Sequence, residues 1–260
     1  MAGTDSPQRS VSIARVLDFA GEQSRYFGVA PATAAPLTIS DFVGDTRRGG
    51  SCNTATITMN PHCHGTHTEC IGHILDRRMD AISVIPLDRL RATVVSVRAL
   101  TAARCAETLT AATEPGDRVL SLAALRKALG RRKPRDALII RTRPNPTSKR
   151  TQHYDHSTDY PFLTRTALEW IVDQDIAHIL IDTPSLDRME DGGRLEAHRV
   201  FWQLPAVGRQ LTRSARRHAT ITEMIFVPNS IADGHYMLAL QPTPFSGDAT
   251  PSNPTLFYKR

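Results

Sequence analysis

The chain has 260 residues, of which 40% are hydrophobic and 22% charged, a composition typical of a globular protein and unlike that of collagen or a disordered chain. No run of about 18 apolar residues could cross a bilayer, and the polar N-terminus lacks the apolar centre of a secretory signal. The net charge of +6 comes with only 6% aromatic residues and no nucleic-acid-binding signature, so we expect no nucleic-acid partner. The four cysteines form no CxxC pair, which favours a reducing compartment. We therefore expect a soluble cytoplasmic protein without a membrane partner.

The first part of the chain gives few clear elements. Residues 1–10 are polar and are expected to be flexible, whereas residues 12–22 carry a weak helical period. The Ala- and Pro-rich residues 29–36 are predicted to form a loop. Residues 53–59 alternate β-branched side chains, which predicts an extended strand that leads into the histidine-rich residues that follow.

The second part of the chain alternates apolar strands with amphipathic helices. Apolar runs predict buried strands, and apolar residues spaced by three and four predict helices capped by Ser121 and by Thr164 or Thr166. The expected strands are 92–97, 136–142, 177–181, 219–227 and 235–240, and the expected helices are 121–130, 164–172 and 195–203. A long polar loop is predicted for 143–160 and a Pro-rich tail after 240. This order predicts one α/β domain with a mixed sheet over residues 1–260.

The most chemically dense segment is residues 60–73, here called the histidine cluster. It holds four of the ten histidines, two of the four cysteines and one carboxylate. Imidazole, thiolate and carboxylate groups are the side chains that bind zinc and similar divalent ions. Four histidines so close together are hard to explain as isolated surface or core residues, so the segment predicts a metal or catalytic site.

Within the histidine cluster, strand geometry selects the first ligand candidates. Side chains at i and i+2 share one face of a strand, so His67 and Glu69 project together, and regular alternation would add Cys63. Gly65 is a natural place for a bulge or bend, which would bring in His62 or His64 instead. The first ligand is thus one of His62, Cys63 and His64. The role of His73, after Gly72, is open between ligand, general base and hydrogen-bond partner of a ligand.

Three residues further along the chain are candidates of different kinds. Glu223 lies in a strand that is apolar on both sides, where an unpaired carboxylate is costly to bury, so it needs a metal or an arginine. Asp182 ends a buried strand, where functional groups of α/β proteins gather, and we expect it to be part of the substrate pocket wall. His198, on an expected helix, would by itself be a surface or core residue.

Several segments resemble motifs of one known family. Residues 64–69 together with His73 resemble the HxGTHxDxPxH motif of the bacterial kynurenine formamidase and putative cyclase family, metal-dependent hydrolases that include isatin hydrolases. Residues 181–187, Ile-Asp-Thr-Pro-Ser-Leu-Asp, resemble that family's IDTPSxD loop. His198 falls where the family has a histidine of its second metal position, and residues 221–223 resemble the strand with its last glutamate ligand.

The resemblance implies a swivelling β/β/α fold, a homodimer or homotetramer, and one or two Zn²⁺ or Mn²⁺ ions. It implies that His67 and Glu69 are metal ligands, with Glu69 able to bridge two ions, that His198 and Glu223 complete the second site, and that His73 is the acid/base. The chain departs from the motif at three positions: Cys63 replaces a histidine, Glu69 replaces an aspartate, and Ile71 replaces a proline.

The activity implied by the resemblance is metal-dependent hydrolysis of an amide C–N bond in a small-molecule substrate. The family's best-known reaction converts N-formylkynurenine to kynurenine and formate in tryptophan catabolism, so an arylformamidase is the first expectation. Isatin-type ring opening and lactone hydrolysis or cyclisation are the alternatives within the family. A metal-binding relative without turnover is the alternative outside enzymes.

Overall fold

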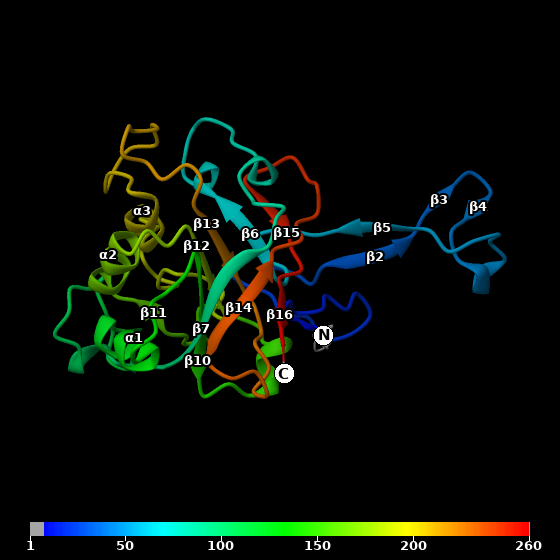
Figure 1. Ribbon diagram of the computed structural model, residues 1–260. Coiled ribbons are helices and arrows are strands. Elements are labelled where there is room, and N and C mark those ends of the chain that lie inside the picture. The colour runs from blue at the N-terminus through cyan, green and yellow to red at the C-terminus, as the bar shows by residue number, and fades with distance from the viewer. Residues whose placement is uncertain (1–7, 260) are drawn as a thin grey trace, which may run out of the picture.

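The computed structural model describes residues 8–259, and its centre is a curled sheet of nine strands (Figure 1). From one edge to the other, the strands are β1 (Arg9–Ser12), β16 (Thr255–Tyr258), β14 (Gly234–Ala239), β7 (Leu90–Arg98), β10 (Ala137–Arg143), β12 (His178–Ile181), β13 (Thr220–Glu223), β6 (His67–Cys70) and β15 (Ala249–Pro251). Strands β7, β10, β12 and β13 are parallel to their neighbours in this group, and every other pairing is antiparallel.

The parallel strands form the buried middle of the sheet because their sequences are apolar on both faces. In β10, Leu138 and Ile140 pack into the core on one face, and Ile139 packs into the core on the other. Ile140 is paired with Val95 of β7 and Ile181 of β12. The predicted α/β class with a mixed sheet is confirmed.

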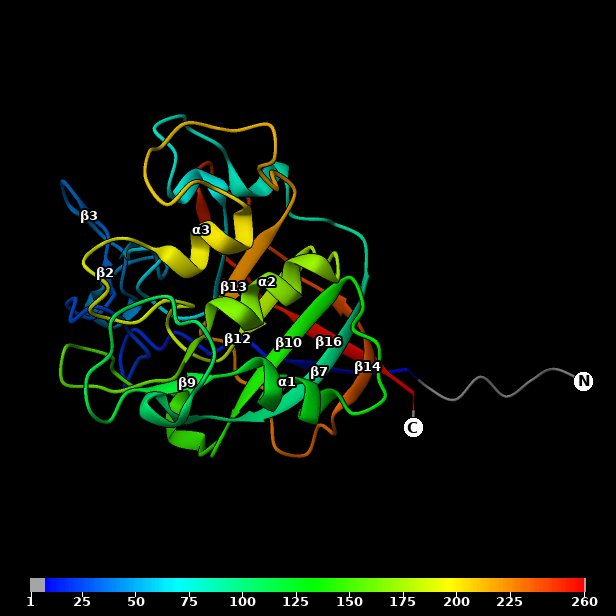
Figure 2. The same ribbon diagram turned by 90° about the vertical axis from the view of Figure 1, so that its left-hand side faces the viewer.

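Three helices cover one face of the sheet, in front of β7, β10, β12 and β13 in Figure 2. They are α1 (Leu122–Leu129), α2 (Arg165–Asp173) and α3 (Glu196–Trp202). The hydroxyl of Ser121 accepts a hydrogen bond from the amide of Ala124, and Thr164 does the same for Ala167. Since these caps satisfy amides that a helix start leaves unpaired, the first two helices begin where the sequence predicts.

Smaller sheets and short helical turns complete the described residues. One three-stranded sheet contains β8 (Leu100–Thr101), β9 (Arg118–Leu120) and β11 (Phe162–Leu163). Two ribbons, β2 (Thr33–Pro36) with β5 (Ala55–Thr58) and β3 (Thr38–Ile39) with β4 (Phe42–Val43), form an arm that extends from the body in Figure 1. The 3-10 turns are Thr46–Arg48, Ile71–His73, Ala81–Ser83, Ala102–Arg104 and Thr147–Arg150. None of the helices in residues 8–259 is long and apolar enough to cross a membrane.

Three expectations about the local structure are wrong, and a fourth lies partly outside the described residues. Residues 12–22 contain no helix. The amide of Ile13 instead donates a hydrogen bond to the carbonyl of Pro254, and the carbonyl of Ile13 accepts one from the amide of Phe226. Residues 33–36, expected in a loop, form β2, and the Pro-rich tail forms β15 and β16. The expected flexible segment 1–10 lies outside the described residues up to position 7, while Arg9 and Ser10 belong to β1.

Candidate metal centre

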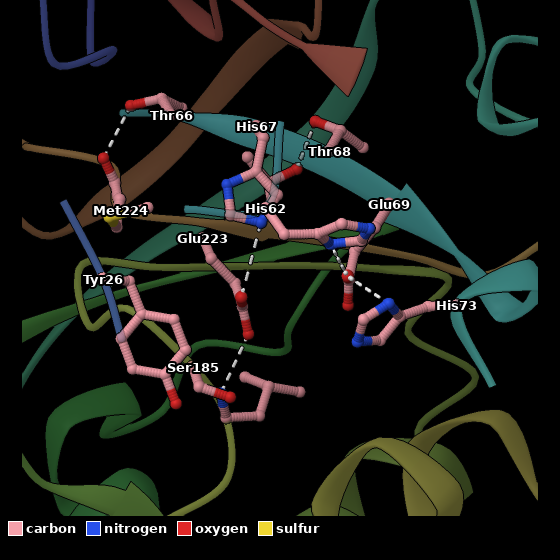
Figure 3. Close-up of polar contacts among 12 residues, drawn as sticks. Tyr26, His62, Thr66, His67, Thr68, Glu69, His73, Ser185, Glu223 and Met224 are labelled. Carbon is pink, nitrogen blue, oxygen red and sulfur yellow. Dashed lines mark hydrogen bonds and ion pairs between the residues drawn. The ribbon is translucent and has the colours of Figure 1, made fainter. Parts of the chain in front are cut away.

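Strand β6 brings the histidine cluster into the sheet. All four of its residues are buried, and it lies between β13 and β15. His67 is opposite Glu223 of β13, and Glu69 is opposite Ile221 of β13 and Ala249 of β15. Because side chains alternate along a strand, His67 and Glu69 share a face, as the sequence predicts, and Figure 3 shows both beside His62 and His73.

The chain turns at Gly65, whose φ of 68° lies in the left-handed region that favours glycine. The three candidates for the first ligand come just before this turn, and their side chains face different partners. His62 directs its Nδ1 atom to Glu69 Oε2, 3.0 Å away. His64 is turned to the backbone, with Nε2 2.9 Å from the carbonyl oxygen of Ala30 and Nδ1 2.9 Å from the amide of Asn60. Cys63 lines the adjoining cavity, and burial, reinforced by the charge of Glu223, raises the pKa of its thiol.

Glu69 is the carboxylate on which three histidines converge. Besides His62, its Oε2 atom faces His73 Nδ1 at 3.9 Å, and its Oε1 atom faces His198 Nε2 at 2.9 Å. Burial alone would raise the pKa of the Glu69 carboxyl, but the positive charges of His73 and His198 outweigh it and hold the pKa well below its usual range. The carboxylate is therefore kept ionised inside the protein.

A second carboxylate joins the group from β13. Glu223 Oε2 lies 3.5 Å from His67 Nε2, and Glu223 Oε1 lies 3.6 Å from His198 Nε2. The amide of Leu186 also donates a hydrogen bond to Glu223 Oε1, at 2.9 Å. Glu223 thus connects β6, β13 and α3 at one point of the sheet, and Figure 3 shows it beside His67 of β6.

The donor set has the chemistry of a divalent-cation site. The ligand atoms of His62, Glu69 and His73 lie within 4.8 Å of one another, and so do those of His67, Glu69 and Glu223. His67 Nε2 and Glu69 Oε1 are both buried without a hydrogen-bond partner among the described residues, and Glu69 Oε1 has His198 Nε2 2.9 Å away as an ion-pair partner. Buried polar atoms are normally satisfied, so these two ligand atoms without a hydrogen-bond partner fit a cation such as Zn²⁺ or Mn²⁺.

The carboxylates of the site raise the pKa of two of its histidines. Burial lowers the pKa of His62, but hydrogen bonds to Asp248 and Glu69 outweigh it and raise the pKa to about 10. His198 behaves alike, because Glu69 and Asp187 overcome the effect of burial and raise its pKa well above the usual value. A divalent cation bound by these rings would displace their protons.

Two carboxylates at the site were missed by the sequence reasoning. Asp187 accepts a hydrogen bond from His198 Nδ1 at 2.5 Å and another from the amide of Ala197, so it fixes the start of α3. It is the last residue of the segment that resembles the IDTPSxD loop, which is the signal that could have found it. Asp248 contacts His62 and His73 from the loop before β15, and no pattern in the tail pointed to it.

A cavity of about 360 Å³ opens beside the candidate metal centre. Its apolar and aromatic wall contains Tyr26, Phe27, Met189 and Leu195. Burial raises the pKa of the Tyr26 hydroxyl, which lies 3.2 Å from that of Tyr160. Arg188 is the single lysine or arginine among the described lining residues, and it is already bonded to Asp117 and to the carbonyl of Glu190. The cavity can therefore hold a small apolar or aromatic molecule.

Asp182 is the predicted site residue that the structure places elsewhere. It is fully buried, accepts hydrogen bonds from the amide of Thr142, and pairs with Lys149 Nζ at 2.9 Å. It lines a separate cavity of about 160 Å³. Its surroundings are those of a structural ion pair that joins the ends of β10 and β12 to the 3-10 turn Thr147–Arg150.

Replacing Asp182 by alanine is expected to destabilise the fold. Lys149 would be left buried and unpaired, and breaking a buried pair costs about 3–5 kcal/mol. Urea denaturation measures this loss. Asp159→Ala is the matched control, because Asp159 lines the same cavity but forms a half-exposed pair with Arg118, worth about 0–1 kcal/mol. Unchanged stability with a raised KM would instead favour the pocket-wall role expected from the sequence.

The chain was compared with known families, curated proteins and solved structures. A sequence profile of the family described as "Putative cyclase" matches residues 11–188. No curated protein matches. His198, Glu223 and Asp248 lie beyond the matched residues, so their place at the site rests on the structure.

Solved structures share the fold at low identity. An isatin hydrolase bound to the product analogue thioisatinate has 13% identity and a TM-score of 0.63, covering 97% of this chain and 93% of its own. Isatin hydrolase A from Labrenzia aggregata, bound to benzyl benzoate, has 14% identity and a TM-score of 0.60, covering 97% and 94%. A predicted metal-dependent hydrolase from Bacillus stearothermophilus has 13% identity and a TM-score of 0.59, covering 97% and 99%. The expected cyclase-like fold is confirmed.

Proposed function

The chain belongs to the family of putative cyclases, and we propose that it is a metal-dependent hydrolase that cleaves an amide C–N bond in a small-molecule substrate. The observation that carries the proposal is the convergence of four histidines, His62, His67, His73 and His198, on the buried carboxylates of Glu69 and Glu223 beside a cavity. The orphaned Nε2 atom of His67 at that point supports a cation rather than an arginine as the missing partner.

We assign the metal positions to the residues that converge there. His67, Glu69, Glu223 and His198 would hold one or two ions, and Glu69 belongs to both donor groups. His62 is the best placed of the three first-ligand candidates, because its ring reaches Glu69 while His64 faces the backbone. Nitrogen and oxygen donors suit Zn²⁺ and Mn²⁺ alike, whereas a thiolate from Cys63 would favour zinc.

A divalent cation supplies Lewis-acid polarisation of a carbonyl group and makes water a better nucleophile at neutral pH. His73 would move the proton. Its Nδ1 atom faces Asp248 and Glu69, and Nε2 makes no hydrogen bond to any residue from 8 to 259. We propose that Nε2 gives the proton to the leaving nitrogen.

The lining of the cavity bears on the substrate. An arylformamide such as N-formylkynurenine is the first candidate, as the family resemblance implies, and its aromatic ring would suit the wall formed by Tyr26, Phe27 and Met189. N-formylkynurenine also carries a carboxylate, yet Arg188, the single lysine or arginine among the described lining residues, is already paired. This favours a second candidate without that charge, isatin-type ring opening or lactone hydrolysis, which agrees with the isatin hydrolases among the structural neighbours.

Metal removal followed by a substrate panel tests the proposal. The purified chain would be stripped with a chelator, reloaded with Zn²⁺ or Mn²⁺, and assayed on N-formylkynurenine, isatin and an aryl lactone. We expect hydrolysis of at least one amide to be lost on stripping and restored on reloading, with an unchanged circular dichroism spectrum. Hydrolysis that survives stripping would contradict the metal-dependent mechanism. Metal binding without turnover on any substrate would favour the non-catalytic alternative.

A homodimer or homotetramer stays a prediction that hydrodynamic measurement can test. The arm formed by β2, β3, β4 and β5 supports the prediction of an oligomer. Every residue of β5 is exposed, as are the first three residues of β2, and an isolated two-stranded hairpin is at best marginally stable in water.

A further inference from the structure

Asp248 contacts two histidines of the candidate metal centre although the family resemblance gives it no role. Its Oδ2 atom accepts a hydrogen bond from His62 Nε2 at 2.7 Å and lies 3.3 Å from His73 Nδ1. The opposite nitrogen of His62, Nδ1, faces Glu69 Oε2. The His62 ring is therefore held between two carboxylates, one on each side, and it packs against the His73 ring with centroids 4.2 Å apart.

The backbone holds Asp248 in this position. Its carbonyl oxygen accepts a hydrogen bond from the amide of Cys70 at 2.9 Å, and that of Gly247 accepts one from Ala81 at 2.7 Å. Gly72 allows the close approach, since a Cβ atom there would lie 3.2 Å from the Asp248 Cβ and 2.7 Å from the carbonyl oxygen of Met79. The aspartate is thus fixed against the end of β6 by contacts that do not involve its carboxylate.

We propose that Asp248 is a positioning residue that orients His62 to take the ligand place where the family motif has a histidine and this chain has Cys63. The inference rests on the proposed metal-dependent function. A histidine that binds a metal commonly donates its other ring N–H to a carboxylate, which fixes its tautomer and orientation. His62 fits this arrangement, because Nε2 is bonded to Asp248 and Nδ1 faces the carboxylate shared by both donor groups.

The exposed fractions of His62 and Asp248 distinguish their contact from an ion pair on the open surface. The His62 side chain is 26% exposed and the Asp248 side chain 39%, whereas Glu69 behind them is 1% exposed. The pair thus lies at the mouth of the site. His62 lines the cavity, so its orientation decides whether a donor nitrogen faces the buried carboxylate.

The test measures Zn²⁺ affinity of metal-free protein by competition with a chromogenic chelator. Loss of such a carboxylate partner typically costs about 10–100-fold in metal affinity, so we expect that loss for Asp248→Ala. Asp248→Asn keeps an acceptor oxygen and is expected to recover part of the affinity. Asp76→Asn is the matched control, since Asp76 is 57% exposed and pairs with Arg209 at 3.8 Å, and it should bind Zn²⁺ like the unaltered chain.

A double-mutant cycle separates positioning of His62 from a general structural effect. If Asp248 acts through His62, the Asp248→Ala change adds little further loss in a His62→Ala background. An equal loss in both backgrounds, or unchanged affinity in Asp248→Ala, would overturn the proposal even though the unaltered chain binds Zn²⁺. Failure of the unaltered chain to bind Zn²⁺ would instead remove the proposed function, and this inference with it. Circular dichroism of Asp248→Asn shows that the comparison is made on folded protein.

Discussion

Glu69→Gln is expected to abolish metal binding and hydrolysis together. Both oxygens of Glu69 face histidines, and the residue belongs to both groups of potential ligands. Glutamine keeps the size of the side chain and removes its charge, so the site loses the anion around which it is built. We expect metal affinity to fall by more than the roughly 10–100-fold that a lost partner of a ligand costs, and turnover to become undetectable.

Metal content by inductively coupled plasma mass spectrometry, with the substrate panel, measures the effect of Glu69→Gln. Glu169→Gln is a suitable control, because Glu169 lies on α2, is 54% exposed and, within residues 8–259, forms its ion pair with Arg165 on the same helix. A Glu69→Gln variant that keeps both its metal and its activity would show that the histidine cluster is not the active site. Loss of metal with full activity would place the reaction elsewhere in the chain.

His73→Gln is expected to lower kcat by about 10²- to 10⁴-fold, the usual contribution of a general acid or base. The metal should remain, because His67, Glu69, Glu223 and His198 keep their mutual contacts without His73. KM should change little if the ring acts only on the proton of the leaving nitrogen. The measurement is steady-state kinetics together with metal content.

The same variant decides between two roles for His73, since its Nδ1 atom also lies within reach of Glu69. If metal and activity are lost in parallel, His73 is a ligand and another group must move the proton. His235→Gln serves as the control, because that histidine is exposed on β14, away from the cluster, and its side chain bonds to Thr93. Unaltered kcat in His73→Gln would remove it from the mechanism.

Local sequence patterns predict the parts of the fold that depend on local interactions. Ser121 and Thr164 start helices because their hydroxyl groups cap nearby amides. His67 and Glu69 share a face because alternation is a local property of a strand. Glu223 is buried on β13, where it contacts His67 and His198, and its expected metal or arginine partner stays a prediction.

Long-range pairing accounts for what the sequence left open. The choice among His62, Cys63 and His64 depends on the turn at Gly65, whose direction is set by contacts of neighbouring residues with distant segments. Asp248 reaches the site only because β15 pairs with β6, more than 175 residues earlier in the chain. The three-residue β15 carries no periodic pattern of its own. Asp182 was predicted to be part of the pocket wall because it follows the end of a buried strand. In the structure its carboxylate pairs instead with Lys149, which comes from a different segment.

Anomalous diffraction from crystals loaded with Zn²⁺ or Mn²⁺ tests the central claim most directly. The metal-dependent account predicts one or two strong peaks among His62, His67, Glu69, His198 and Glu223, beside the cavity lined by Tyr26 and Phe27. Fully loaded crystals without a peak between Glu69 and Glu223, or with the ion bound only at another part of the chain, would contradict it.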